Sequence, residues 1–184
     1  MKQVAIVGYA HPSKDRAPFD NFEYDIWGLN YLYYRIPRKT LWFEMHDFNN
    51  HGVESVEPEK YREWLRTTNT PVMMQGKDSG IQSSIRYPIE TITRFYGGYF
   101  YCSVDYMIAL AIWQGYENIE LYGIHCLKEY EFENKGIQYW LGVCRGKGIR
   151  FSLPEEAEIL RPSFYGYKES RYDKISTRDY DSRN

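Results

Sequence analysis

The sequence has few cysteines and no long apolar segment, and both absences restrict what the protein can be. Its three cysteines, Cys102, Cys126 and Cys144, are far apart, and no CxxC or zinc-type Cys/His spacing occurs, so neither a disulfide framework nor a zinc site is expected. The longest nearly unbroken apolar run, Met107 to Trp113, is well short of the roughly 18 residues that a membrane-spanning helix needs. The start, MKQVAIVG, reads directly into a strand and has no signal-peptide pattern. We therefore expect a reduced, cytoplasmic protein.

The sequence also lacks a large excess of positive or negative charge. The formal net charge is -2 and the pI about 6.1, so no overall basic field would draw the protein to nucleic acid or to an anionic membrane. The 184 residues, 43% hydrophobic and 26% charged, suffice for one globular domain. Aromatic residues are abundant at 18%, with 19 tyrosines. Tyrosine suits half-buried packing and also surfaces that stack on rings or sugars, and both interpretations remain open.

Short β-rich runs alternate with helical patterns along the chain. This alternation is typical of a parallel sheet with helices on both faces. We therefore expect an α/β fold with a Rossmann-like, doubly wound, mostly parallel sheet in a single domain, residues 1–163, followed by a polar C-terminal arm, 164–184. The expected strands are 3–8, 24–28, 41–45, 71–75, 118–123 and 149–153, and the expected helices are 58–66, 88–95, 103–114 and 136–145.

The clearest element is the helix expected at 103–114. It is apolar on almost every face, which predicts that it is buried. Ser103 is expected to cap its N-terminus through the side-chain oxygen, and Gly115 to end it in a left-handed conformation. The free N–H groups and the dipole at such a helix start favour an anion, so Ser103 is a candidate phosphate ligand.

In an open parallel sheet, ligands bind beyond the carboxyl ends of the strands, where the strand order reverses. After the first strand come Gly8, which allows close backbone approach, and Ser13, which could cap a helix or bind a phosphate oxygen. The segment is neither GxGxxG nor a P-loop. After the second strand, Asn30 offers an amide donor and acceptor to a base or a ribose. Each of these residues also fits an ordinary turn or cap.

Two histidines follow other strands. His46 comes after the third strand and is flanked by Glu44 and Asp47, so its imidazole could be charged and could act as a general base. His125 follows the strand that ends at Gly123 and is a second candidate base. No recognised metal-ligand spacing links His46, His125 and Glu44, and no metal is expected. A purely structural histidine fits each position as well.

Several segments together resemble the bacterial Rossmann-type sialyltransferases and the related MptE-like pterin pyrophosphokinases. The resemblance spans Val4 to Leu153 and extends to small Rossmann-like proteins encoded by bacteriophages. Each motif matches only loosely, and the resemblance rests on the order of the motifs along the chain. The matching residues are the segment 8–13 with adjacent Pro12-Ser13, Gly28-Leu29-Asn30-Tyr31, Cys102-Ser103, Met107, Ala111, Gly115-Tyr116 and 119–124.

The resemblance implies sugar transfer from a nucleotide-sugar donor, with no separate cofactor. It also implies that Gly8, Ser13, Asn30 and Ser103 line a nucleotide pocket, with Tyr130 near the donor phosphate. The chain departs from the family's pattern at His125, where the family has aspartate, and at Val104, where it has glycine. No histidine follows His125, so the family's late catalytic histidine has no counterpart. His46, His125 and Glu44 are therefore the catalytic candidates.

The leading hypothesis is a glycosyltransferase-like enzyme that binds a nucleotide or nucleotide sugar, with DNA or a glycan as the acceptor. A homo-oligomer is compatible with the sequence, and a membrane partner is not expected. Two alternatives stay open, namely a non-catalytic protein that sequesters a signalling nucleotide and a phosphotransferase acting on a pterin or nucleoside. The same pocket residues would serve all three.

Overall fold

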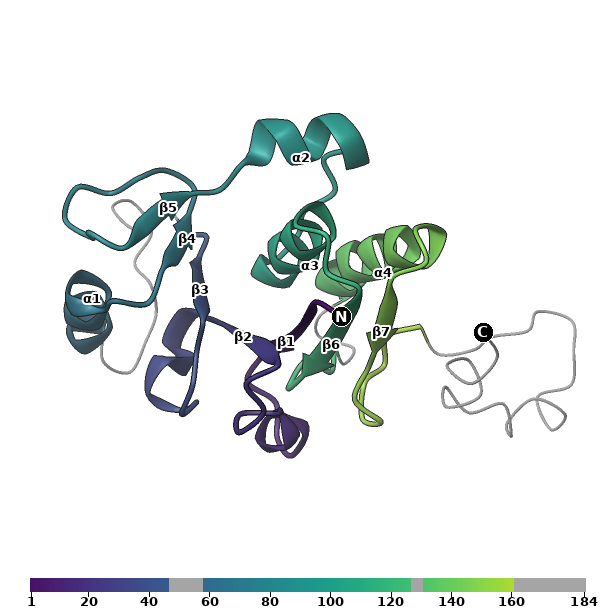
Figure 1. Ribbon diagram of the computed structural model, residues 1–184, viewed down its shortest axis with the longest axis horizontal. Coiled ribbons are helices and arrows are strands. Elements are labelled where there is room, and N and C mark those ends of the chain that lie inside the picture. Colours follow the sequence, from purple (N-terminus) through teal and green to yellow (C-terminus); the bar gives the residue numbers. More distant parts are fainter. Residues whose placement is uncertain (47–57, 127–130, 161–184) are drawn as a thin grey trace, which may run out of the picture.

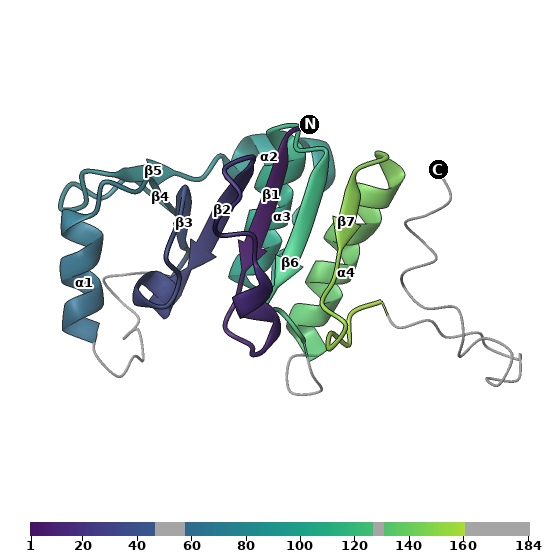
Figure 2. The ribbon, with the colours of Figure 1, turned by 60° about the horizontal axis from the view of Figure 1, so that its bottom comes forward.

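Among the residues that the structure describes, seven strands form one sheet in the computed structural model, in the order β5-β4-β3-β2-β1-β6-β7 (Figures 1 and 2). Every neighbouring pair runs parallel, which confirms the expected α/β, Rossmann-like fold. The structure describes residues 1–46, 58–126 and 131–160, so the expected arm at 164–184 lies outside the described residues. The strands are β1 (Gln3–Val7), β2 (Tyr24–Leu29), β3 (Leu41–Glu44), β4 (Val72–Met74), β5 (Ser84–Arg86), β6 (Asn118–Tyr122) and β7 (Arg150–Ser152).

The two faces of the sheet are covered differently. Helices α2, α3 and α4 lie on one face, and the connections from β1 to β2 and from β2 to β3 cross the other (Figure 1). Those two connections contain short 3-10 helices, η1 and η2, where full helices would be usual. Within the described residues, no helix is long and apolar enough to cross a membrane. The helices are η1 (Ser13–Arg16), η2 (Asn30–Tyr34), α1 (Pro58–Thr67), α2 (Ile89–Tyr96), α3 (Ser103–Trp113) and α4 (Glu131–Gly146).

Helix α3 is buried because it is apolar all round, as the sequence predicts. Its N-cap, however, is Cys102, which is extended, and not Ser103, which is already the first helical residue. The Cys102 side chain bonds the N–H of Asp105, and the Asp105 carboxylate bonds the N–H of Cys102 in return. This reciprocal pair fills the capping role that was expected of Ser103. Gly115 follows with φ +74°, which confirms the left-handed stop.

Other boundaries differ from the sequence prediction. Helix α4 begins at Glu131, five residues before the expected start at position 136, and Glu131 and Glu133 lie in its first turn. Acidic side chains favour a helix N-terminus because they oppose the positive end of the dipole, so the polar start of α4 is regular helix and not loop. The short strand β5 was not expected. It pairs with β4 at the end of the sheet.

The strand order reverses at β1. The chain runs outward from β1 through β2, β3, β4 and β5, then returns through α2 and α3 to place β6 on the other side of β1. Strands β1 and β6 are aligned from Gln3 with Asn118 to Val7 with Tyr122. Their carboxyl ends therefore meet side by side, and this is the switch point where an open α/β sheet binds its ligands.

Candidate functional site

At the switch point, the segments that follow β1 and β6 are joined by backbone bonds. The N–H of Gly8 donates to the carbonyl of Tyr122 (2.7 Å), and the N–H of Ala10 donates to the carbonyl of Gly123 (2.9 Å). A Cβ added at Gly8 would lie 2.5 Å from the Gly123 oxygen. Glycine is thus required at position 8, because a side chain there would prevent the segment after β1 from approaching the segment after β6.

Ser13 fixes the start of η1 to the segment after β6. The side chain is fully buried, and its hydroxyl accepts a hydrogen bond from the N–H of Gly123 (2.8 Å). The same oxygen is hydrogen-bonded to Nε2 of His125 (2.7 Å). Gly8, Ser13 and His125, predicted separately, therefore lie in one cluster. The Ser13 hydroxyl already has two hydrogen-bond partners, Gly123 and His125. Ser13 could therefore bind a phosphate only in addition to these partners or in place of one of them.

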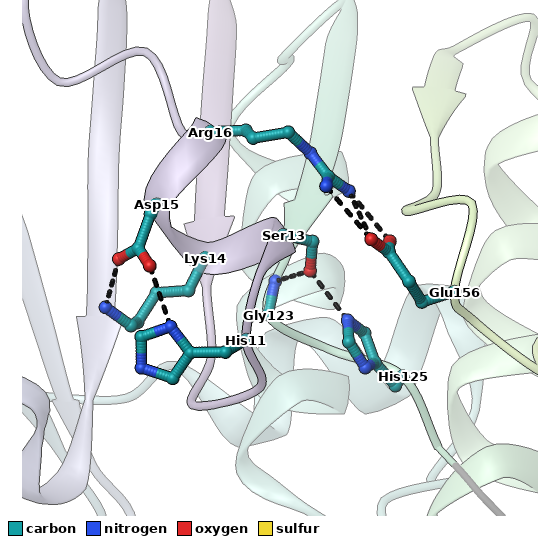
Figure 3. A network of polar contacts seen from close by, with 8 residues as sticks. All are labelled: His11, Ser13, Lys14, Asp15, Arg16, Gly123, His125 and Glu156. Atoms are coloured by element: carbon teal, nitrogen blue, oxygen red, sulfur yellow. Dashed lines mark hydrogen bonds and ion pairs between the residues drawn. The ribbon is translucent and has the colours of Figure 1, made fainter.

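Two sets of side chains extend on opposite sides of η1 (Figure 3). On one side, the Arg16 guanidinium donates bidentate hydrogen bonds to the carboxylate of Glu156 at 2.7–2.9 Å. Arg16 thereby ties η1 to the segment that follows β7, as Ser13 ties it to the segment that follows β6. The pairing lowers the pKa of Glu156, chiefly through the hydrogen bond from Arg16.

On the other side of η1 lie His11, Lys14 and Asp15 (Figure 3). His11 Nδ1 is 2.7 Å from Asp15 Oδ2, and Lys14 Nζ donates to Asp15 Oδ1 at 2.5 Å. This group of three residues was not predicted from the sequence. The four-residue separation of His11 and Asp15 was a visible signal, but no helical pattern around it suggested that the two side chains meet.

Asn30 lies at the carboxyl end of β2, next to the β1 segment. It is the first residue of η2, in a left-handed conformation with φ +51°. Its Oδ1 is buried and has no hydrogen-bond partner among the described residues. Burial chiefly raises the pKa of Tyr9, and the charge of Tyr34 raises it further. Because β2 is a neighbour of β1 in the sheet, Asn30 at the end of β2 lies one strand away from the switch point.

A second polar cluster stands at the carboxyl end of β3. Glu44 is fully buried, and its Oε1 lies 2.7 Å from Nδ1 of His46. Its other oxygen, Oε2, accepts a hydrogen bond from the Tyr61 hydroxyl (2.8 Å), which accepts one from Trp42 Nε1 (3.0 Å). The His46 side chain is 48% exposed. The expected pairing of Glu44 with His46 is therefore present, with a buried chain of hydrogen bonds behind it.

The two candidate bases do not share a reacting centre. His46 follows β3 and His125 follows β6, and β2 and β1 lie between these strands. Three strand spacings of about 4.8 Å put the two positions roughly 14 Å apart at the edge of the sheet. One of them at most can act on a given acceptor hydroxyl, while a ligand lying along the edge could reach from one to the other.

Ser103 is the first residue of α3. Burial chiefly raises the pKa of Cys126, and the charges of Glu133 in α4 and Asp105 in α3 raise it further. Ser103 is partly buried at this end of α3. Tyr130, the remaining predicted nucleotide ligand, lies outside the described residues.

Elsewhere the structure has a hollow that the sequence did not suggest. A cleft of about 450 Å³ lies at the amino ends of β6 and β7, lined by Tyr116, Glu117, Lys147 and Arg150 among others. It is at the opposite edge of the sheet from the switch point. Among the described residues, no three His, Cys, Asp or Glu side chains are grouped as metal ligands would be.

No protein-family model matches the chain, and no curated protein matches it, but solved structures do. The sialyltransferase CstII from Campylobacter jejuni in complex with the substrate analogue cytidine-5'-monophosphate is 17% identical, with a TM-score of 0.55 over 86% of this chain and 82% of that chain. CST-II in complex with a trisaccharide acceptor and CMP is 17% identical, with a TM-score of 0.56 over 89% of each chain. A tyrosine-to-phenylalanine variant of CST-II in complex with CMP is 16% identical, with a TM-score of 0.57 over 89% of each chain. The chain therefore has a sialyltransferase-like fold.

Proposed function

We propose that the protein binds a nucleotide sugar along the carboxyl edge of its sheet and transfers the sugar to an acceptor hydroxyl. The observation that carries this proposal is the switch point, where Gly8, Ser13 and His125 form one cluster between β1 and β6. Open parallel sheets bind ligands at such points. The solved neighbours support the proposal, since they are sialyltransferases in complexes with CMP, with CMP-3FNeuAc and with a trisaccharide acceptor.

The nucleotide would lie over the segments that follow β1 and β2. Asn30 has a buried side-chain oxygen without a partner among the described residues, and such a group gains a hydrogen bond when a ligand reaches it. Ser103 and the first N–H groups of α3 would face an anionic group of the nucleotide sugar, because a helix N-terminus favours an anion. Gly8, Ser13 and Tyr130 complete the proposed nucleotide site.

His46 is the more suitable of the two candidate bases. Glu44 engages its Nδ1, which leaves Nε2 to take a proton from the acceptor. His125, in contrast, uses Nε2 to contact Ser13. In the proposed step, the acceptor O–H proton moves to His46 Nε2 and the acceptor oxygen bonds to the anomeric carbon. The bond from that carbon to the phosphate oxygen breaks, and the phosphate leaves with the electron pair.

Binding is tested first, with CMP, UDP, GDP, ADP and their sugars in a thermal-shift series. A ligand at 100 times its Kd adds roughly 2.7 kcal/mol to the stability of the folded state, which is readily measured. We expect a cytidine nucleotide to raise the melting temperature. A flat response to every nucleotide and nucleotide sugar would contradict the proposal.

Turnover is tested next, by release of free nucleotide from the donor that binds. His46→Gln should abolish release and leave donor affinity unchanged, while His125→Gln should affect affinity more than turnover. If the parent protein binds a nucleotide but releases none with DNA or glycan acceptors or with water, the protein is a nucleotide-binding module. A transfer of phosphate in place of sugar would instead support the pterin or nucleoside phosphotransferase alternative.

A further inference from the structure

Lys14 is a buried lysine at the carboxyl edge of the sheet. Its side chain is 6% exposed, and a Cβ added at Gly123 would lie 3.0 Å from Lys14 Cβ, so its stem packs against the segment after β6. An ammonium has three N–H donors. In the described part of the chain, the hydrogen bonds of Lys14 end on a single acceptor, Asp15 Oδ1. Burying a cation is costly unless anionic partners accompany it. Here the anionic partner is the single carboxylate of Asp15.

The Asp15 carboxylate lies between Lys14 and His11, in the position that an anionic ligand of these two side chains would take. Its two oxygens accept from two different donors, Lys14 Nζ at 2.5 Å and His11 Nδ1 at 2.7 Å. Both Asp15 (57% exposed) and His11 (60% exposed) reach solvent. The hydrogen bond from Lys14 chiefly, and that from His11 in addition, lower the pKa of Asp15, so the carboxyl group is an anion at neutral pH. Its oxygens mark where two oxygens of another anion would be held.

The backbone beneath this group is fixed independently of it. Ser13 and Arg16 anchor η1 from its other side, to Gly123, His125 and Glu156 (Figure 3). The Asp15 side chain can therefore rotate into solvent while η1 and the Lys14 stem stay in place.

We propose that Lys14 Nζ and His11 Nδ1 bind the phosphate of the nucleotide, and that the Asp15 carboxylate occupies this site until the phosphate displaces it. The ligand class is a phosphate monoester or diester next to a nucleoside. In the sugar-transfer step, Lys14 would neutralise the charge that develops on the leaving phosphate. The inference rests on the proposed function for the nucleoside part of the ligand, whereas anion binding at Lys14 can be measured by itself.

Calorimetric titrations of the full chain with CMP, cytidine and inorganic phosphate test the inference. Asp15→Asn removes the competing charge and should tighten CMP binding about threefold or more, while Lys14→Gln should weaken it about tenfold or more, as loss of a charged hydrogen bond does. Cytidine, which lacks the phosphate, should bind all variants within about twofold. The matched control is Lys2→Gln, since Lys2 Nζ donates to the Gln114 carbonyl at the other edge of the sheet, and CMP affinity should not change.

The outcomes separate this inference from the proposed function. Equal CMP affinity in the parent and in Asp15→Asn overturns the phosphate site and leaves nucleotide binding intact. Because Asp15 is exposed, that variant should fold even if Lys14→Gln does not. Binding of inorganic phosphate that requires Lys14, with no binding of any nucleotide, supports the anion site and overturns the proposed function. No response to inorganic phosphate or to any nucleotide in the parent and in Asp15→Asn overturns both.

Discussion

Glu44 Oε1 lies 2.7 Å from His46 Nδ1, so a fully buried carboxylate holds a half-exposed imidazole at the end of β3. The hydrogen bond that His46 Nδ1 donates to Glu44 raises the pKa of His46, against the opposing effect of burial. The folded-state pKa of His46 is therefore above that of the unfolded chain. Its contribution to stability is fully present below the unfolded value of about 6.5 and is lost as the pH rises through the folded value.

Glu44→Gln is expected to lower the pKa of His46. The neutral amide no longer favours the imidazolium, so only the effect of burial remains. The measurement is an NMR titration of the imidazole signals, with His46→Gln to assign the His46 resonance. The explanation fails if His46 titrates below about 6.5 in the parent protein or if its pKa is the same in Glu44→Gln.

Tyr61→Phe is expected to destabilise the protein through the groups that it leaves unpaired. The Tyr61 hydroxyl donates to Glu44 Oε2 and accepts from Trp42 Nε1. Without it, a buried N–H and a buried carboxylate oxygen each lose a partner, at roughly 1–3 kcal/mol apiece. Urea unfolding measures the loss. Tyr34→Phe, at a position 64% exposed, is the control and should change the free energy of unfolding by less than about 0.5 kcal/mol. A comparable change in the two variants would mean that the buried hydrogen bonds contribute nothing.

The central elements of the fold could be predicted because they consist mostly of apolar residues, which indicates that they are buried. Strand β1 is buried at every position, and α3 is apolar all round, so both stand out in the sequence. Strand β5 does not, since two of its three residues are exposed. The 3-10 helices η1 and η2, of four and five residues, are too short to show a period.

The candidate site was predictable only in its location. The ends of β1, β2, β3 and β6 were expected to carry it, and they bring Gly8, Ser13 and His125 together. The partners of these residues were not predictable, because they come from distant parts of the chain. Arg16 and Glu156 are 140 residues apart, and no local pattern joins them. The burial of Lys14 likewise depends on its packing against Gly123, which only the folded chain creates.

Gly8→Ala and Gly142→Ala are expected to change stability in opposite directions. A Cβ at Gly8 would lie 2.5 Å from the Gly123 oxygen, whereas a Cβ at Gly142 in α4 meets nothing within 4 Å. Overpacking typically costs about 1–3 kcal/mol, while glycine to alanine inside a helix gains roughly 0.5–1 kcal/mol. Thermal unfolding of both variants provides the comparison. A Gly8→Ala protein as stable as the parent would show that the segments after β1 and β6 can separate at no cost.

Asp105 is expected to make the protein less stable as the pH rises from about 4 to 7. The carboxyl is fully buried against Gly136, and burial raises its pKa from 3.8 to about 6 even though the N–H groups of Tyr101 and Cys102 donate to it. The folded state therefore keeps a proton that the unfolded chain releases, and stability falls across this interval. Asp105→Asn cannot titrate, so the free energy of unfolding of the parent relative to this variant should drop by about 2 kcal/mol between pH 4 and pH 7. Urea unfolding at several pH values measures the difference, in which the titration of all other groups cancels. A difference that stays constant with pH would show that Asp105 has the same pKa in the folded and the unfolded state, and that its two backbone hydrogen bonds offset its burial.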